Sequence, residues 1–130
     1  MRSRENLAWA AGLFEGEGSF SLNRTGDNLR CQAAVAMTDE DTVVRFRDIL
    51  GVGKVYGPYG PYAGSKKVFW RWHVYSAEHV QAVAAMLWPW LGDRRRTRAT
   101  EVLQARRVWE LAARVGLGGD IVKTTTTVTQ

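Results

Sequence analysis

Two similar rounds of side-chain periodicity constrain the fold of this chain more than any single motif does. In each round, a segment with helical spacing of apolar residues precedes two segments in which polar and apolar residues alternate. The alternating segments are 19–23, 30–37, 52–56 and 67–75, and the helical ones are 6–15, 39–50, 77–87 and 93–115. Hairpins linked by helices in this order predict an α+β domain of the form αββαββα(α). Its sheet has four antiparallel strands, and helices cover one face.

Turn and capping residues support these boundaries. The stretch 25–28 consists of residues that favour turns, and the acidic residues at 39–41 suit the positive end of a helix dipole. Ser76 is expected to cap the helix that follows it, and Gly51 is expected to end the helix that precedes it. The stretch 57–64 is rich in glycine and proline, and is predicted to be a loop.

Length and charge indicate one domain with a polyanionic partner. The chain has 130 residues, of which 18 are Lys or Arg and 13 are Asp or Glu, giving a net charge of +5. Nucleic acid is the first candidate partner. Cys31 is the single cysteine, and no leader or apolar run of membrane-spanning length is evident, so a reducing aqueous compartment without membrane contact is expected. The domain is predicted to cover 1–115, and 116–130 to form a glycine-rich exit and a flexible tail.

Small residues line one face of the first helical segment. Ala8, Gly12 and Gly16 recur every four residues and Ala11 lies beside them, so this stripe lacks side-chain bulk. Two helix backbones can approach closely along such a stripe. The alternative is that the stripe fits the helix into the core of its own domain. The apolar residues expected to pack against the sheet are Leu7, Ala10, Leu13 and Phe14.

Glu17 stands at the C-terminal end of the same helical segment, where a carboxylate is unfavourable unless a cation joins it. Its carboxylate and the Gly16 carbonyl offer the hard oxygen ligands that Mg²⁺ prefers. If two such helices pack side by side, two Glu17 residues converge with their metals on adjacent phosphates. That arrangement suits hydrolysis of a phosphodiester bond assisted by two metal ions.

Three phrases of the sequence together resemble the LAGLIDADG homing endonucleases. They are Ala-Gly-Leu-Phe-Glu-Gly-Glu-Gly at 11–18, Met-Thr-Asp-Glu-Asp at 37–41 leading into 49–53, and Leu-Trp-Pro-Trp-Leu at 87–91. The resemblance covers most of the chain. It implies a double-strand DNA endonuclease, active in intron homing, that depends on Mg²⁺ or Mn²⁺ and recognises a specific sequence. Because the chain holds one copy of the first phrase, the family pattern implies a homodimer on a near-palindromic target.

The resemblance also implies roles for individual residues. Glu17 is the catalytic metal ligand, with Gly16 beside it. Counted from Pro89, Arg94 aligns best with a basic residue near the scissile phosphate, and Arg95 is the alternative; the whole cluster also suits simple phosphate binding. Asp39 matches a position that organises catalytic water, but a helix cap is the competing interpretation. The predicted dimer interface is formed by Ala8, Ala11, Gly12 and Glu15.

Strand alternation supplies a polar surface for DNA, because successive side chains point to opposite faces of a sheet. The strand residues predicted to contact DNA are Ser19, Ser21, Asn23, Arg30, Gln32, Lys54, Tyr56, Arg71 and His73. Arg95 and Arg96 are predicted to join them from the last helix. Arg and Lys suit guanine edges in the major groove, whereas Asn and Gln suit adenine. The alternative is that this polar face is simply exposed to solvent and binds no ligand. The six tryptophans are expected to fill the core instead.

A different class of function remains open on the same scaffold. A nucleic-acid-binding protein without cleavage activity, such as an RNA maturase or a DNA-binding regulator, would share the polar face. Glu17 favours the endonuclease, whereas arginine in place of the usual lysine near residue 94 leaves room for the alternative. The expected location is the cytoplasm of a bacterial or phage host, with an organelle as the alternative.

Overall fold

The computed structural model describes residues 2–64 and 66–116, which form a four-stranded antiparallel sheet and four α-helices. The strands are β1 Gly18–Thr25, β2 Asn28–Met37, β3 Lys54–Tyr59 and β4 Phe69–Val74. The helices are α1 Arg4–Glu17, α2 Glu40–Leu50, α3 Ala77–Leu87 and α4 Asp93–Arg114, with a short 3₁₀ helix, η1 Trp88–Trp90, before α4. The strand order in the sheet is β1-β2-β4-β3. The predicted fold class is confirmed.

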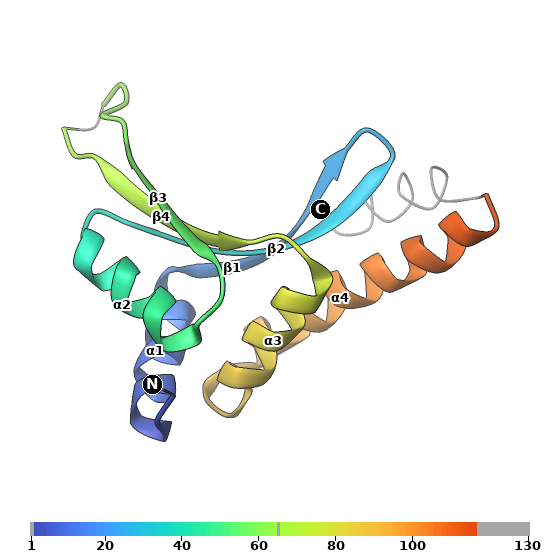
Figure 1. Ribbon diagram of the computed structural model, residues 1–130, viewed down its shortest axis with the longest axis horizontal. Coiled ribbons are helices and arrows are strands. Elements are labelled where there is room, and N and C mark those ends of the chain that lie inside the picture. The colour runs from blue at the N-terminus through green and yellow to red at the C-terminus, as the bar shows by residue number, and fades with distance from the viewer. Residues whose placement is uncertain (1, 65, 117–130) are drawn as a thin grey trace.

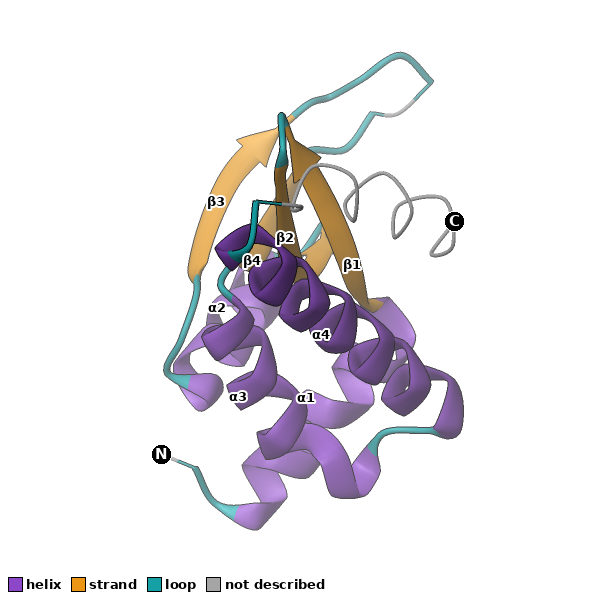
Figure 2. Ribbon diagram, turned by 90° about the vertical axis from the view of Figure 1, so that its right-hand side faces the viewer, coloured by secondary structure: helices purple, strands orange, loops and turns teal. Residues whose placement is uncertain are grey.

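All four helices lie on one side of the sheet, and no helix of residues 2–64 and 66–116 covers the other side (Figure 1). The β1–β2 and β3–β4 hairpins rise at the two ends of the sheet, so the uncovered side is concave. Figure 2 shows the same separation from the side, with the strands above the helices. No helix within the described ranges combines the length and apolar character needed to cross a membrane.

The bounds of β3 differ from the sequence prediction. Strand β3 continues through Gly57 and Pro58 to Tyr59, which pairs with Phe69, so the prediction that 57–64 is entirely a loop is wrong. The register shifts between Tyr56 and Tyr59. Because β3 is an edge strand, the proline that lacks an N–H is tolerated there. The predicted tail, 116–130, lies outside the described residues except for its first glycine.

The core lies between the sheet and the helices and is built around aromatic rings. The centroid of the Phe14 ring is 4.8 Å from that of Phe20 and 6.3 Å from that of Phe46. The Phe46 ring meets Trp72 edge to face at 4.8 Å, and Trp72 Nε1 donates a hydrogen bond of 2.9 Å to the Val52 carbonyl. Contacts among these rings therefore join α1 and α2 to strands β1 and β4.

The expectation that the tryptophans mostly fill the core is confirmed for four of the six. Trp72 is fully buried in the core, and Trp9, Trp70 and Trp90 are partly buried and pack against it. Trp88, in contrast, is 38% exposed. Trp9 and Trp109 also form polar contacts: the Arg45 guanidinium carbon lies 3.9 Å from the Trp9 ring centroid, and Trp109 Nε1 donates to the Asp27 carbonyl.

Candidate active site

Helix α1 passes directly into strand β1, because Glu17 is the last helical residue and Gly18 is the first residue of the strand. The helix therefore ends two residues later than predicted. Gly18 has extended backbone, and its N–H donates to the Phe14 carbonyl to close the last turn. Glu17 is exposed at this junction. Its carboxylate accordingly stands where the C-terminal end of α1 meets the sheet.

The two glycines that flank Glu17 have different surroundings. A Cβ atom added to Gly18 would overlap the ring of Phe14, which is completely buried. A Cβ atom added to Gly16 would meet no heavy atom within 4 Å. Gly18 is therefore required by packing inside the domain. Gly16 leaves open space next to the Glu17 carboxylate, where another molecule can approach the backbone.

The two glycines are expected to respond differently to alanine. Gly18→Ala should destabilise the fold by about 1–3 kcal/mol, since the buried Phe14 ring cannot move aside without strain. Gly16→Ala is the matched control, and it should leave stability unchanged or raise it by up to about 1 kcal/mol because alanine favours helix. Urea unfolding of both variants measures this. Equal losses would contradict the distinction between them.

Glu15 links α1 to the start of α4. Its Oε1 accepts a hydrogen bond of 2.7 Å from the backbone N–H of Gly92, the N-cap residue of α4. A carboxylate is favoured there because the N-terminal end of a helix carries partial positive charge. The structural role predicted for Glu15 therefore has a contact within one chain. Its place in a dimer interface stays a prediction.

Of the two candidate arginines, Arg95 is the one that reaches α1. Its Nη2 donates a hydrogen bond of 3.0 Å to the Glu15 carbonyl, and its guanidinium carbon lies 5.9 Å from the Phe14 ring centroid. A cation is favourable at this negative end of the helix dipole. Arg94 is exposed in the first turn of α4. The structure thus brings Arg95, rather than Arg94, beside the last turn that carries Glu17.

Two further arginines of α4 bind backbone carbonyls. Arg96 donates through Nε and Nη2 to the Trp88 carbonyl, at 3.1 and 2.8 Å, and so ties α4 to η1. Arg98 Nε donates to the Phe20 carbonyl at 3.2 Å, beside the start of β1. Arg98 was not among the predicted contact residues, although the arginine-rich stretch contains it. Its contact shows that α4 also supports the first strand.

Asp39 is the N-cap residue of α2, but its side chain forms no capping hydrogen bond to the backbone. Its Oδ2 accepts a hydrogen bond of 2.5 Å from the Thr42 hydroxyl instead. The side chain is exposed. The position of Asp39 thus agrees with the helix-start interpretation, and a role in organising water stays a prediction.

The small-residue stripe of α1 is narrower than predicted. Gly12 and Gly16 are exposed, and a Cβ atom added to either would meet no heavy atom within 4 Å. Ala8 is half-buried. Ala11, however, is 0% exposed and belongs to the core, so its assignment to an interface is wrong. The helical turn places it on the same side as Ala10, facing the sheet and the other helices.

The predicted orientation of the strand side chains is confirmed by the register. Across β1 and β2, Ser19 pairs with Ala34, Ser21 with Gln32 and Asn23 with Arg30, and such partners share a face. In the other hairpin, His73 pairs with Lys54, and Arg71 pairs with Tyr56. Their β2 partners, Ala34 and Ala36, connect the two halves of the surface. Small side chains therefore form its middle, and longer polar ones flank them.

Gln32 requires a correction. It is 5% exposed, and its Oε1 accepts a hydrogen bond from Asn23 Nδ2. It pairs with Ser21 of β1, and the β2–β4 pairing begins one residue later, at Ala33. Gln32 therefore supports Asn23 instead of presenting its own amide to a ligand.

Four side chains form a continuous row across the uncovered face. The His73 ring centroid lies 4.9 Å from that of Tyr56, with the planes 21° apart, and 4.4 Å from that of Tyr75. The Arg30 guanidinium carbon lies 5.4 Å from the Tyr75 ring centroid. We call Tyr56, His73, Tyr75 and Arg30 the aromatic row. Tyr75 was absent from the predicted contact set, although the alternation through Arg71 and His73 points to it.

Burial, and secondarily the charge of Arg71, lowers the pKa of His73 below its ordinary value. The side chain is partly exposed, and its Nδ1 is buried without a hydrogen-bond partner. The imidazole is therefore neutral at pH 7, when one ring nitrogen donates and the other accepts.

The lowered pKa of His73 has a consequence for stability. Between the unfolded value of about 6.5 and the lower folded value, the unfolded chain binds the proton more readily, so falling pH favours unfolding. We expect His73→Gln to reduce the loss of stability between pH 7 and pH 5, as measured by urea unfolding. His79→Gln, on the exposed side of α3, is the matched control. An unchanged pH slope in His73→Gln would contradict this assignment.

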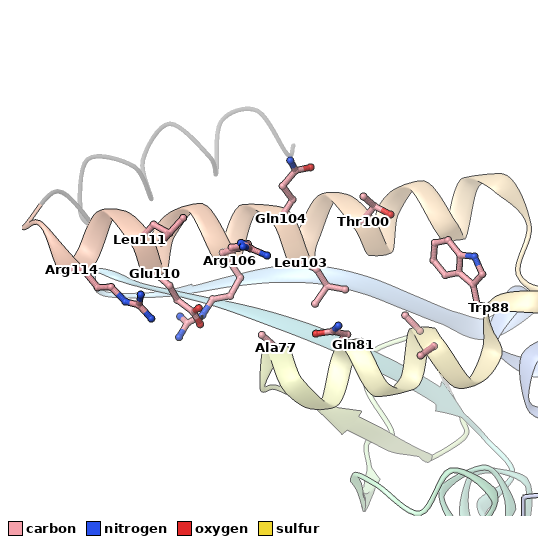
Figure 3. Close-up of a pocket in the computed structure, with 13 residues that line it drawn as sticks. Ala77, Gln81, Trp88, Thr100, Leu103, Gln104, Arg106, Glu110, Leu111 and Arg114 are labelled. Carbon is pink, nitrogen blue, oxygen red and sulfur yellow. Dashed lines mark hydrogen bonds and ion pairs between the residues drawn. The ribbon is translucent and has the colours of Figure 1, made fainter.

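A groove lies elsewhere, between α3 and α4 (Figure 3). Its volume is about 1180 Å³, and Ala77 and Gln81 face Leu103 and Arg106 across it. None of the site residues predicted from the sequence lines this groove. Within 2–64 and 66–116, no group of three or more His, Cys, Asp or Glu side chains is close enough to hold a metal ion.

Comparisons with known proteins give a fold and no sequence family. No protein-family model matches the chain, and no curated protein sequence does. A structure of the homing endonuclease I-CvuI in complex with an I-CreI target aligns with a TM-score of 0.65 at 20% identity, covering 97% of this chain and 95% of that chain. The group I intron-encoded homing endonuclease I-CeuI complexed with DNA aligns with a TM-score of 0.67 at 13% identity, covering 92% and 62%. The homing endonuclease I-TnaI gives 0.62 at 13% identity, over 100% of both chains.

Helices on one face of a concave, four-stranded antiparallel sheet are the arrangement that this chain shares with these structures. The chain has the fold of the LAGLIDADG homing endonucleases, and the resemblance stated from the sequence is confirmed at the level of the fold.

Proposed function

We propose that this protein is a sequence-specific endonuclease that cuts both strands of DNA, with a divalent metal ion, as a homodimer. The observation that carries the proposal is the exposed carboxylate of Glu17 where α1 meets the uncovered polar face. Solved structures with the same fold include homing endonucleases bound to DNA. The fold supplies a surface for a duplex, and Glu17 supplies the chemistry at its edge.

The residues at the end of α1 fit a divalent ion. Glu17 is exposed, Gly16 leaves open space beside it, and the helix end presents carbonyl oxygens, which together are hard ligands. Mg²⁺ or Mn²⁺, when bound, supplies an activated water and stabilises the leaving oxygen of the phosphodiester. Two of the similar structures were obtained with Mg or Ca.

The remaining residues bind and orient the duplex in this proposal. Ser19, Ser21 and Asn23 lie on the strand that follows Glu17, so contacts with bases and the placing of the carboxylate involve one element. Arg95 holds the end of α1 and brings positive charge to it, whereas Arg94 is free to approach a phosphate. The net charge of +5 attracts the phosphate backbone, so DNA binding is expected to weaken with added salt.

Self-association along α1 completes the proposed site. The open backbone at Gly12 and Gly16 permits close contact with the same surface of a second copy, and a twofold axis there would bring the two Glu17 residues together. Sedimentation on a selected DNA target tests this. A dimer is expected, and a single protomer per cleaved site would contradict the proposal.

The test of the whole proposal is selection of cleaved sequences from a randomised DNA library in the presence of Mg²⁺. Enrichment of a near-palindromic sequence, cut in both strands, is the expected result. A library that remains uncut would contradict the nuclease.

A non-cleaving binder is the second candidate. It is favoured by arginine at 94–96, because guanidinium is a poor proton donor or acceptor. Selection of bound sequences without any cleavage would identify it, and preferential binding of RNA would point to a maturase.

A further inference from the structure

We propose that Tyr75 is a positioning residue that holds the Arg30 guanidinium for recognition of a guanine in each half of the DNA target. This inference rests on sequence-specific DNA binding by the uncovered face. It adds Tyr75 to the residues of that face that determine specificity, and it assigns one guanine to each half of the target. The inference applies equally to a nuclease and to a non-cleaving DNA binder, because it concerns recognition alone.

The N–H donors of Arg30 are available to a ligand. It lies on β2 opposite Asn23, with its side chain exposed on the uncovered face. Within the described residues it forms no hydrogen bond or ion pair, and its one recorded partner is the Tyr75 ring. Contact with the π face of a ring leaves the N–H donors in the guanidinium plane available.

Three arginines near the β1–β2 hairpin are already engaged. Arg98 donates to the Phe20 carbonyl, and Arg24 donates to the Gly26 carbonyl. Arg106 donates to Asn28 and to the Leu29 carbonyl, and it also pairs with Glu110. Arg30 therefore differs from them in having a fixed ring neighbour without a competing acceptor.

The Tyr75 ring is in turn contacted by the ring of His73. Tyr75 follows directly after β4, it is 36% exposed, and the His73 ring lies 4.4 Å from its ring centroid. His73 in turn stacks on Tyr56 of the edge strand at 4.9 Å. The aromatic row thus restrains the plane of Tyr75, and Tyr75 restrains the guanidinium in contact with it.

This arrangement favours guanine over a phosphate. An arginine in the major groove donates two parallel hydrogen bonds to O6 and N7 of guanine, which requires a fixed plane. A phosphate contact needs only charge and gains little from a stacked ring. Holding the guanidinium before binding also lowers the conformational entropy lost on recognition.

The experiment is selection of bound sequences from a randomised duplex library, read without cleavage, for the wild type and four variants. Arg30→Ala should reduce the preference for one guanine per half-site by about 5- to 150-fold, the range for a bidentate arginine contact. Tyr75→Ala should reduce the preference at the same base by about 2- to 5-fold, the range for an exposed cation–π contact. Tyr75→Phe keeps the ring and should keep the preference. Arg107→Ala, at an exposed arginine of α4 on the helical side of the domain, should leave this base unaffected.

Each result of this experiment either supports or overturns the inference. If Tyr75→Ala keeps the full guanine preference, or if Arg30→Ala weakens all sequences equally and lowers the salt dependence by about one phosphate contact, the inference is overturned. If Tyr75→Phe behaves like Tyr75→Ala, the ring face is not the cause and the inference fails. A wild type that selects no sequence overturns the proposed function as well, whereas the other failures leave that function intact.

Discussion

Replacing Glu17 with glutamine is expected to lower the rate of DNA cleavage by at least ~100-fold while leaving DNA affinity within about a factor of ten. The amide has the shape of the carboxylate but lacks its charge, so it is a poor ligand for a hard divalent ion. The stabilisation that such an ion gives to the transition state is worth several kcal/mol, and each 1.4 kcal/mol corresponds to a factor of ten. Single-turnover cleavage and gel-shift titration on a selected target measure the two quantities.

Glu15→Gln is the matched control for this experiment. It changes a carboxylate two residues earlier on the same helix, and its amide oxygen can still accept the hydrogen bond from the Gly92 N–H. Cleavage by this variant should stay within about tenfold of the wild type, since the retained oxygen preserves the contact. Wild-type cleavage by Glu17→Gln would remove Glu17 from the chemistry. Loss of binding in that variant would assign Glu17 to DNA affinity instead.

Trp72→Ala is expected to lower the free energy of unfolding by about 3–5 kcal/mol, the largest stability effect in the domain. Trp72 is completely buried, it meets Phe46 edge to face, and its indole N–H is bonded to the Val52 carbonyl. Alanine removes these contacts and leaves a cavity and an unpaired carbonyl. The midpoint of urea unfolding, followed by circular dichroism, measures the loss.

Two further tryptophan variants serve as comparisons for the loss of stability in Trp72→Ala. Trp72→Phe keeps much of the buried area but loses the hydrogen bond, and its stability should lie between wild type and Trp72→Ala. Trp88→Ala removes a tryptophan that is 38% exposed, and should cost clearly less. A loss for Trp72→Ala no larger than that for Trp88→Ala would show that the core tolerates the cavity.

The sequence predicts the arrangement of the elements well because periodicity records which face each segment buries. The alternation of Trp70, Trp72 and Val74 with Arg71 and His73 is reproduced by the strand register. The helical order and the uncovered sheet face follow from the same patterns. These features depend on residues close together in the chain, where spacing alone carries the information.

Such patterns do not predict contacts between segments that are far apart in the sequence. Spacing from Pro89 favoured Arg94, but the start of α4 is held to α1 through the Gly92–Glu15 hydrogen bond, and there Arg95 reaches the Glu15 carbonyl. Ala11 has the size expected of an interface residue, and only the position of α1 against the sheet shows that it is buried. Likewise, nothing in the local sequence shows that Gly18 is needed because of the Phe14 ring.

The absence of any linking residue between α1 and β1 has a consequence for fidelity. In the proposed nuclease, a β1 strand that meets an incorrect base sequence would settle differently on the duplex, and the Glu17 carboxylate at its start would move with it. A displacement of about 1 Å at a reacting centre is enough to slow a reaction about 100-fold. Incorrect base contacts would thus slow cleavage even where the protein stays bound, so discrimination between correct and incorrect targets is expected to be greater in cleavage rate than in affinity.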